Sequence, residues 1–160
     1  LGKVTFAPGS KLETIQYRAF AECSITDITI PASVREIRAS AFEQSDKMIN
    51  VTIEDNSQLE IIGECAFFMT NITGFDMPES VKRIEYSAFA CCDITEITLP
   101  AGLEYIGDAA FEGCIWMTKV TSKMITPIPI ETFTFLHTAL GAIYVPAESV
   151  EEYKKVWKLQ

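Results

Sequence analysis

The sequence predicts an α/β repeat solenoid, a right-handed stack of similar coils with a parallel β-sheet on its concave face and a short helical cap at the C-terminal end. Three observations predict this fold. A strand signature of three apolar residues occurs seven times, once with serine at its last position, a pair of apolar residues five positions apart occurs six times, and the last fifteen residues include apolar residues with helical spacing. A unit with one apolar side is stable only when it stacks against copies of itself.

The strand signature has the form Φ-x-x-Φ-x-Φ, where Φ is apolar, and it is clearest over residues 94–99. Side chains alternate in an extended strand, so Ile97 and Leu99 point to one side and Thr98 to the other. Pro100 then ends the strand, because proline has no amide hydrogen to donate. Successive signatures begin 22 to 24 residues apart, which predicts seven parallel strands. The seven signatures are Leu1/Val4/Phe6, Ile25/Ile28/Ile30, Met48/Val51/Ile53, Ile72/Phe75/Met77, Ile94/Ile97/Leu99, Met117/Val120/Ser122 and Leu140/Ile143/Val145.

The second half of each repeat carries an isoleucine followed five residues later by a phenylalanine. The residue before the phenylalanine is alanine in five repeats and Thr132 in the sixth, so a small residue is required where neighbouring coils approach closely. We therefore expect a row of phenylalanine side chains in the core. The pairs are Ile15/Phe20, Ile37/Phe42, Ile62/Phe67, Ile84/Phe89, Ile106/Phe111 and Ile128/Phe133.

Three repeats depart from the pattern. Residues 7–11 and 54–58 lengthen the turn after the strand, and their turn-forming residues predict small loop insertions. The sixth repeat is irregular, because Ser122 replaces an apolar strand residue and prolines stand on both sides of Ile128.

The last strand ends at Val145 and a short helix is expected to follow it. Ser149 is placed to cap this helix, with Glu152 three residues further on. The predicted domain organisation is about six and a half repeats of period 22–25 over residues 1–145, and a capping segment over residues 146–160 that closes the end of the stack. The apolar residues with helical spacing are Val150, Tyr153, Val156 and Trp157.

Apolar periods of 20–29 residues are typical of leucine-rich repeats, whose short strands form a parallel sheet on the concave side. The consensus Ile-Thr-x-Ile-Thr-Ile-Pro-x-x-Val-x-x-Ile-x-x-x-Ala-Phe, at residues 25–42 and with leucine at two positions at 94–111, resembles the BspA-like leucine-rich repeats of bacterial surface proteins. The resemblance extends over practically the whole chain. It implies a role in adhesion to host matrix proteins, mucosal colonisation or contacts between cells.

Composition excludes several classes of protein. The chain has 160 residues, of which 48% are apolar, so it is long and apolar enough to bury a core. The formal charge of -9 and the absence of a basic cluster argue against nucleic acid and anionic membrane as partners. No apolar run approaches the length of about 18 residues that spans a bilayer. The first signature begins at residue 1, so we expect the sequence to start within a repeat array, with any leader or anchor outside it.

The sequence contains five cysteines, which are potential reactive or bridging groups. Cys23, Cys92 and Cys114 each stand three residues after the phenylalanine of their repeat, where Ser45 and Thr70 stand in other repeats. This exchange indicates a small-residue packing position. The number is odd and there is no C-x-x-C pair, which favours free buried thiols, with a Cys92–Cys114 bridge as the alternative.

The only candidate for catalysis is a pair of residues from neighbouring coils. His137 is the sole histidine, and its spacing from Phe133 allows it to face Cys114 as a Cys-His dyad. No orienting third group or oxyanion donor is identifiable. Cys65 occupies a position that holds unrelated residue types in other repeats, so the repeat pattern does not require a cysteine there. We expect no enzymatic activity, no cofactor and no metal.

The concave face is where leucine-rich repeats usually bind, and its outward residues form two columns. Seven strands about 4.8 Å apart span roughly 29 Å, enough for one protein-sized footprint. The alternative interpretation is that threonine has high β propensity and packs well on its cross-strand neighbour. The central column is Thr5, Thr29, Thr52, Asp76, Thr98, Thr121 and Tyr144, and the flanking column is Lys3, Asp27, Asn50, Gly74, Glu96, Lys119 and Ala142.

The predicted function is a non-enzymatic cell-surface or secreted interaction and adhesion module. Its expected partner is another protein or glycoprotein, from host matrix or a cell surface, bound through the concave sheet. The competing hypothesis is a structural spacer that holds another domain away from the cell surface and binds nothing.

Overall fold

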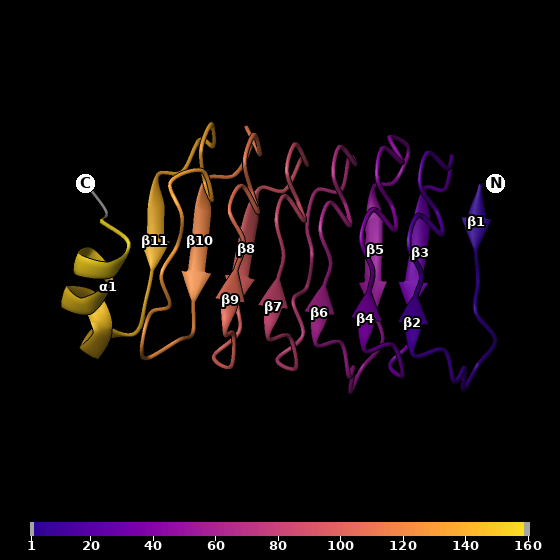
Figure 1. The fold of residues 1–160 in the computed structure, drawn as a ribbon, viewed down its shortest axis with the longest axis horizontal. Helices are drawn as coiled ribbons and strands as arrows, with labels where there is room; N and C mark the ends of the chain where they lie inside the picture. The colour runs from indigo at the N-terminus through magenta and orange to yellow at the C-terminus, as the bar shows by residue number, and fades with distance from the viewer. Residues whose placement is uncertain (1, 159–160) are drawn as a thin grey trace.

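The computed structural model describes residues 2–158, which form a row of stacked coils with the two ends of the chain at opposite ends of the stack (Figure 1). We number the coils from the N-terminus by their predicted strand segment, so coil four contains residues 72–77. Each coil is one turn of the chain, and equivalent residues of neighbouring coils lie side by side. The predicted fold class is confirmed, and α-helix occurs in the described residues only in the C-terminal cap.

The longer strands lie on one side of the coils and are parallel. They form two three-stranded sheets, in the orders β1-β3-β5 and β8-β10-β11. Their pairing joins equivalent residues of successive repeats, such as Thr29 with Thr52 and Glu96 with Lys119, so the outward columns have the predicted register. The strands are β1 Lys3–Val4, β3 Asp27–Ile30, β5 Asn50–Ile53, β8 Glu96–Leu99, β10 Lys119–Ser122 and β11 Ala142–Tyr144.

A second sheet, which the sequence analysis did not anticipate, runs along the other side of the coils. Its five parallel strands have two residues each and are in the order β2-β4-β6-β7-β9 (Figure 1). In each of these strands the inward residue is the isoleucine of the predicted isoleucine–phenylalanine pair. The strands are β2 Thr14–Ile15, β4 Glu36–Ile37, β6 Ile61–Ile62, β7 Arg83–Ile84 and β9 Tyr105–Ile106.

Coil four contradicts the expectation of seven strands, because residues 72–77 form no strand and the long sheet is divided there. The inward residue of this coil is Phe75, which is 5% exposed, where the other coils have isoleucine or valine. Its ring meets those of Phe67 and Phe89 edge-on, at centroid distances of 5.4 and 5.1 Å. The larger ring has to fit beside the phenylalanine stack, and Gly74 offers no side chain for cross-strand pairing. These two residues account for the lost strand.

The core is organised around a continuous stack of phenylalanine rings. Successive rings are 5.0 to 5.4 Å apart and nearly parallel, and Trp157 of the cap follows at 6.0 Å. The stack has the ring order Phe20, Phe42, Phe67, Phe89, Phe111, Phe135 and Trp157.

The prediction that Phe133 is the last member of this row is wrong. Phe133 is 47% exposed, whereas the Phe135 ring stacks on Phe111 at 5.4 Å. Buried Thr134, rather than Thr132, takes the small-residue position, and its carbonyl accepts the Phe111 amide hydrogen at 2.9 Å. The sequence contains isoleucine–phenylalanine pairs with the required spacing at both 128/133 and 130/135, so the pattern alone did not distinguish the two registers.

The first six coils turn through left-handed backbone conformations on the side away from the long strands. Two equivalent positions have φ between 50° and 70° in coils one to five, coil six has only the second of them, and most of these residues are not glycine. One of the two positions is that of Cys65, and the other contains His137. The residues are Arg18, Ser40, Cys65, Ser87 and Ala109 at the first position, and Glu22, Gln44, Met69, Cys91, Gly113 and His137 at the second.

The C-terminal segment caps the stack as predicted, but Ser149 does not act as a helix cap. The segment comprises η1 Ala147–Ser149 and α1 Val150–Val156. Buried Ser149 donates its hydroxyl hydrogen to the Ile125 carbonyl at 2.5 Å, so its side chain serves the contact with coil six instead. Tyr153 lies with its hydroxyl 2.5 Å from that of Ser122, which explains the polar residue in the irregular sixth repeat.

Candidate functional site

The outward residues of the long strands and of coil four form one face, which we call the long-strand face. All the central-column residues from Thr29 to Tyr144 lie on it. Thr121 is half-buried and the others are exposed, so the predicted column is present and accessible. Whether these residues contact a partner stays a prediction.

Most charged groups of the flanking column are held by other side chains of the same face. Lys119 Nζ lies 2.6 Å from Glu96 Oε2 and 5.9 Å from the centre of the Tyr144 ring. The hydrogen bond to Glu96 raises the pKa of Lys119. Asn50 donates an amide hydrogen to Asp27 at 2.7 Å, and the hydrogen bonds from Thr26 and Asn50 lower the pKa of Asp27. The predicted residues Asp27, Asn50, Glu96 and Lys119 therefore interact in pairs across neighbouring strands.

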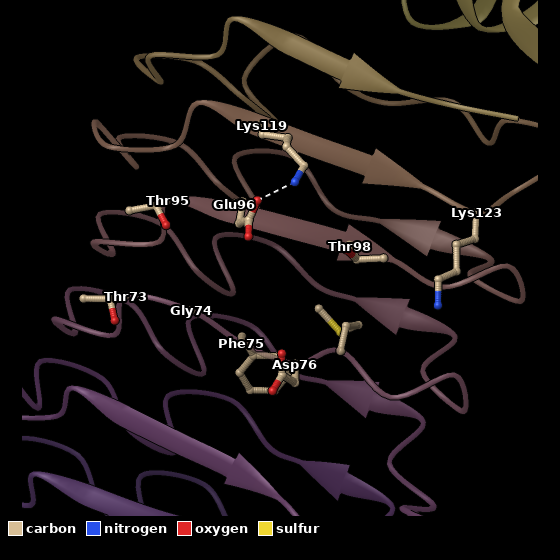
Figure 2. Close-up of a pocket in the computed structure, with 10 residues that line it drawn as sticks. Thr73, Gly74, Phe75, Asp76, Thr95, Glu96, Thr98, Lys119 and Lys123 are labelled. Atoms are coloured by element: carbon tan, nitrogen blue, oxygen red, sulfur yellow. Dashed lines mark hydrogen bonds and ion pairs between the residues drawn. The ribbon is translucent and has the colours of Figure 1, made fainter.

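An open pocket of about 500 Å³ lies on this face beside coil four (Figure 2). A second pocket of about 240 Å³ lies between the same coil and β5. Both pockets border the segment that fails to form a strand. The face is also hollowed over the paired strands β1, β3 and β5, by a pocket of about 580 Å³. The first pocket is lined by Thr73, Gly74, Phe75, Asp76, Met77, Thr95, Glu96, Thr98, Lys119 and Lys123.

Some charged side chains at this pocket form ion pairs with other residues of the chain, and one does not. Lys119 pairs with Glu96, and Lys123 pairs with Glu79 at the edge of the face. Within residues 2–158, Asp76 has neither an ion pair nor a side-chain hydrogen bond, and it stands in a column that is otherwise mostly threonine. The uncompensated charge at the pocket is therefore a carboxylate.

Sequence reasoning selected Asp76, Thr98, Glu96 and Lys119 but missed the pocket itself. Thr73, Phe75, Met77 and Lys123 were not placed on the predicted binding face. A signal was present, because coil four replaces the consensus triplet Glu-Ile-Thr of coil five by Gly-Phe-Asp. Each of these residues is apolar or polar as the pattern requires, so only their sizes and β propensities distinguish them.

The Cys-His dyad is not assembled. Cys114 is buried and donates its thiol hydrogen to the Phe89 carbonyl at 3.1 Å, whereas the His137 side chain is 70% exposed and lies 3.9 Å from Glu112. Burial raises the pKa of Cys114 to about 12, the opposite of what a nucleophilic thiolate needs.

All five cysteines are free thiols, so the Cys92–Cys114 bridge is not formed. Ser45 and Cys92 donate to the carbonyls of Phe20 and Phe67 in the preceding coil, as Cys114 does to Phe89. This shared hydrogen bond explains why the column accepts both serine and cysteine.

Residues 2–158 contain neither a metal-binding cluster nor a membrane-spanning helix. No three histidine, cysteine or acidic side chains in that range converge closely enough to hold a metal ion. The same residues contain no helix with the length and apolar character to cross a bilayer.

A stack of parallel-stranded coils with a polar strand face and a terminal cap defines a leucine-rich-repeat solenoid. The family model for the BspA type leucine rich repeat region matches residues 3–118 with six copies, and the chain belongs to that family. No curated protein matches the chain.

Two bacterial leucine-rich repeat proteins of known structure are similar to the chain. A Treponema pallidum protein is 20% identical with a TM-score of 0.70, and the match covers 94% of this chain and 79% of that one. A Bacteroides ovatus protein is 25% identical with a TM-score of 0.59 over 84% of this chain. The present chain spans 47% of the length of the Bacteroides ovatus protein.

Proposed function

We propose that the chain is a non-enzymatic interaction module, cell-surface or secreted, that binds a protein or glycoprotein through the long-strand face. The observation that carries the proposal is the accessibility of this face along the whole stack, together with its hollowing at coil four. Leucine-rich repeats generally mediate protein–protein interaction, and the family to which the chain belongs supports a surface location.

The charge distribution supports a protein partner over the other classes. The net charge of -9 disfavours nucleic acid and anionic lipid. The face has one exposed aromatic ring in its central column, Tyr144, so a row of rings for stacking sugars is not available there. Regular polar columns on a rigid sheet offer a broad and pre-organised contact area.

The test is binding of the purified chain to immobilised matrix proteins and mucin, compared with a Thr52→Lys/Thr98→Lys variant. Both threonines are exposed on the face, so the variant is expected to fold normally and to lose saturable binding. The matched control, Gln44→Lys/Gln58→Lys, adds the same charge at exposed positions outside the long strands and should bind as the parent does.

Saturable binding that both variants retain would place the contact elsewhere on the molecule. If no matrix protein or mucin bound to any of the folded proteins, the spacer hypothesis would replace the interaction module. The regular threonine column favours that second function, since threonine pairs across strands stabilise a sheet without any ligand.

A further inference from the structure

We propose that the division of the sheet at coil four is a docking site for an arginine side chain of the partner protein. The inference rests on the proposed function and names the contact at its centre. Gly74, Phe75 and Asp76 form the site, between β5 and β8 of the long-strand face (Figure 2).

Coil four has backbone groups that form no backbone hydrogen bonds within residues 2–158. Among the backbone hydrogen bonds of residues 2–158, none involves an amide or a carbonyl of residues 74–77. β5 pairs only with β3, and β8 pairs only with β10, so their other edges are also unpaired. Unpaired backbone groups in the middle of a sheet are rare and costly unless water or a ligand hydrogen-bonds to them.

The Phe75 side chain holds the break in the sheet in place from the core side. The Phe75 side chain is 5% exposed, and its ring packs edge-on against two rings of the core stack. Coil four is therefore anchored from inside, and its backbone groups stay in fixed positions beside the two pockets. A fixed set of acceptors favours binding, because less conformational entropy is lost when a ligand docks.

The charges at the pocket indicate the chemistry of the ligand. Asp76 supplies the one carboxylate at the pocket that has no ion pair within the described residues, while Glu96 is engaged by Lys119 and Glu79 by Lys123. A guanidinium carries five donors and no acceptor, in a planar fork that fits a carboxylate and nearby carbonyls together. An arginine side chain thus complements both the charge of Asp76 and the free carbonyls of coil four.

Two further carboxylates extend the complementarity toward the N-terminal end of the face. Glu54 and Asp27 have no ion pair among residues 2–158 and are used only in hydrogen bonds. The partner segment is therefore expected to be basic on the side of the docked arginine that faces β3 and β5. The contact between the docked arginine and Asp76 sets the position of the partner segment on the long-strand face.

The experiment uses the acetylated and amidated tripeptide Gly-Arg-Gly as a probe and amide chemical shifts of the isotopically labelled chain as the readout. We expect saturable shifts at Gly74, Phe75 and Asp76, with little effect from the tripeptide Gly-Glu-Gly. Asp76→Asn should weaken the binding at least tenfold. Asp55→Asn removes the same charge at an exposed residue of a nearby turn and should leave the binding unchanged.

A third variant restores the consensus of coil five. Gly74→Glu/Phe75→Ile/Asp76→Thr should rebuild the missing strand and abolish binding of the arginine peptide. Equal weakening by Asp76→Asn and Asp55→Asn, shifts confined to other residues, or no saturable shift would each overturn the inference. Asp76→Asn and the shift map decide the question even if the triple variant does not fold.

The outcome is separable from that of the proposed function. A partner protein that needs Thr52 and Thr98 but binds the Asp76→Asn variant normally would leave the proposed function standing and remove the arginine site. Saturable arginine binding at coil four without any protein partner would leave the arginine site standing and remove the proposed function.

Discussion

The left-handed turn residues show how individual positions bear the cost of this fold. Eleven residues at the two turn positions of the coils have positive φ, and only Gly113 among them is glycine. A left-handed conformation costs an L-residue other than glycine about 1 kcal/mol. The repeats accept this cost because the coil closes only through these turns.

Gln44 offers the clearest test of this cost. Its φ is 54° and its side chain is exposed, so replacement by glycine removes strain and little packing. We expect Gln44→Gly to raise the free energy of unfolding by about 0.5 kcal/mol, after allowance for the greater entropy of glycine in the unfolded chain, and Gln44→Val to lower it by about 1 kcal/mol. Chemical denaturation measures both. Gln58→Gly, at an exposed residue without positive φ, is the control and should destabilise; stabilisation there would contradict the explanation.

The buried thiols predict how stability depends on pH. Burial raises the pKa of Cys114 from 9.0 to about 12, and it raises that of Cys92 as well. Between these pH values the folded chain keeps thiol protons that the unfolded chain releases, so unfolding releases protons and stability falls as pH rises above about 9. Below that pH the contribution is fully present.

The measurement is a series of denaturant melts from about pH 8 to about pH 10.5, with Cys92→Ser/Cys114→Ser as the comparison. Serine does not titrate in this range, and Ser45 already occupies the same column with the same hydrogen bond to a phenylalanine carbonyl. The variant should therefore lose less stability than the parent as the pH rises. Parallel losses in the two proteins would refute the assignment to these thiols.

Among the secondary-structure elements, the cap helix shows how one end of the stack is closed. Tyr153 of α1 donates to the Met124 carbonyl at 3.0 Å, and Trp157 donates its indole hydrogen to the Ile128 carbonyl at 2.8 Å. Both acceptors belong to the irregular sixth repeat. Of the irregular residues of this repeat, Ser122 contacts the cap through the Tyr153 hydroxyl, which accounts for the polar residue at that strand position.

Removal of the Tyr153 hydroxyl should destabilise the chain. Tyr153→Phe leaves the Met124 carbonyl and the Ser122 hydroxyl without this buried partner, so we expect a loss of about 1 to 2 kcal/mol in the free energy of unfolding. Tyr17→Phe removes a hydroxyl from a ring that is 66% exposed and should change stability by less than about 0.5 kcal/mol. Equal effects of the two substitutions, measured by thermal or urea unfolding, would show that the cap hydrogen bonds add nothing.

The elements also show what sequence periodicity predicts and where it fails. The register of β3 with β5 and of β8 with β10 follows from apolar spacing, because alternation fixes which side chains point inward. The same spacing did not reveal the lost strand of coil four, since Phe75 is as apolar as the residue it replaces and only its volume differs. The second sheet was missed because strands of two residues carry almost no alternation.

For the candidate site, the sequence predicted which residues lie on the face but not the pocket at coil four. The outward columns follow from strand alternation, so Thr52, Thr98 and Asp76 were correctly placed on one face. The pocket depends on how the Phe75 ring fits against Phe67 and Phe89, which is a packing result that a linear pattern does not contain. The ion pair between Glu96 and Lys119 needed the strand register as well as the sequence.

The whole molecule is held together by contacts between neighbouring coils, with the phenylalanine stack running through all of them. Each coil packs on the coil before it and the coil after it, so stability is approximately a sum of coil and interface contributions. A ring in the middle of the stack belongs to two interfaces at once. Loss of such a ring therefore weakens the packing between its coil and both neighbouring coils.

Phe89 and Phe133 provide a matched pair to test this organisation and the corrected register of the sixth repeat. Phe89 is fully buried between two parallel rings, at 5.3 Å from Phe67 and 5.4 Å from Phe111, and also supports Phe75. Phe89→Ala should therefore cost about 3 to 5 kcal/mol, measured by urea unfolding, whereas Phe133→Ala should cost less than about 1 kcal/mol. If Phe133 instead continued the stack, its replacement would destabilise strongly and Phe135→Ala would be mild. A parent-like melt of Phe89→Ala would contradict the stacked core itself, because a fully buried ring that packs on two neighbouring rings must contribute to the free energy of unfolding.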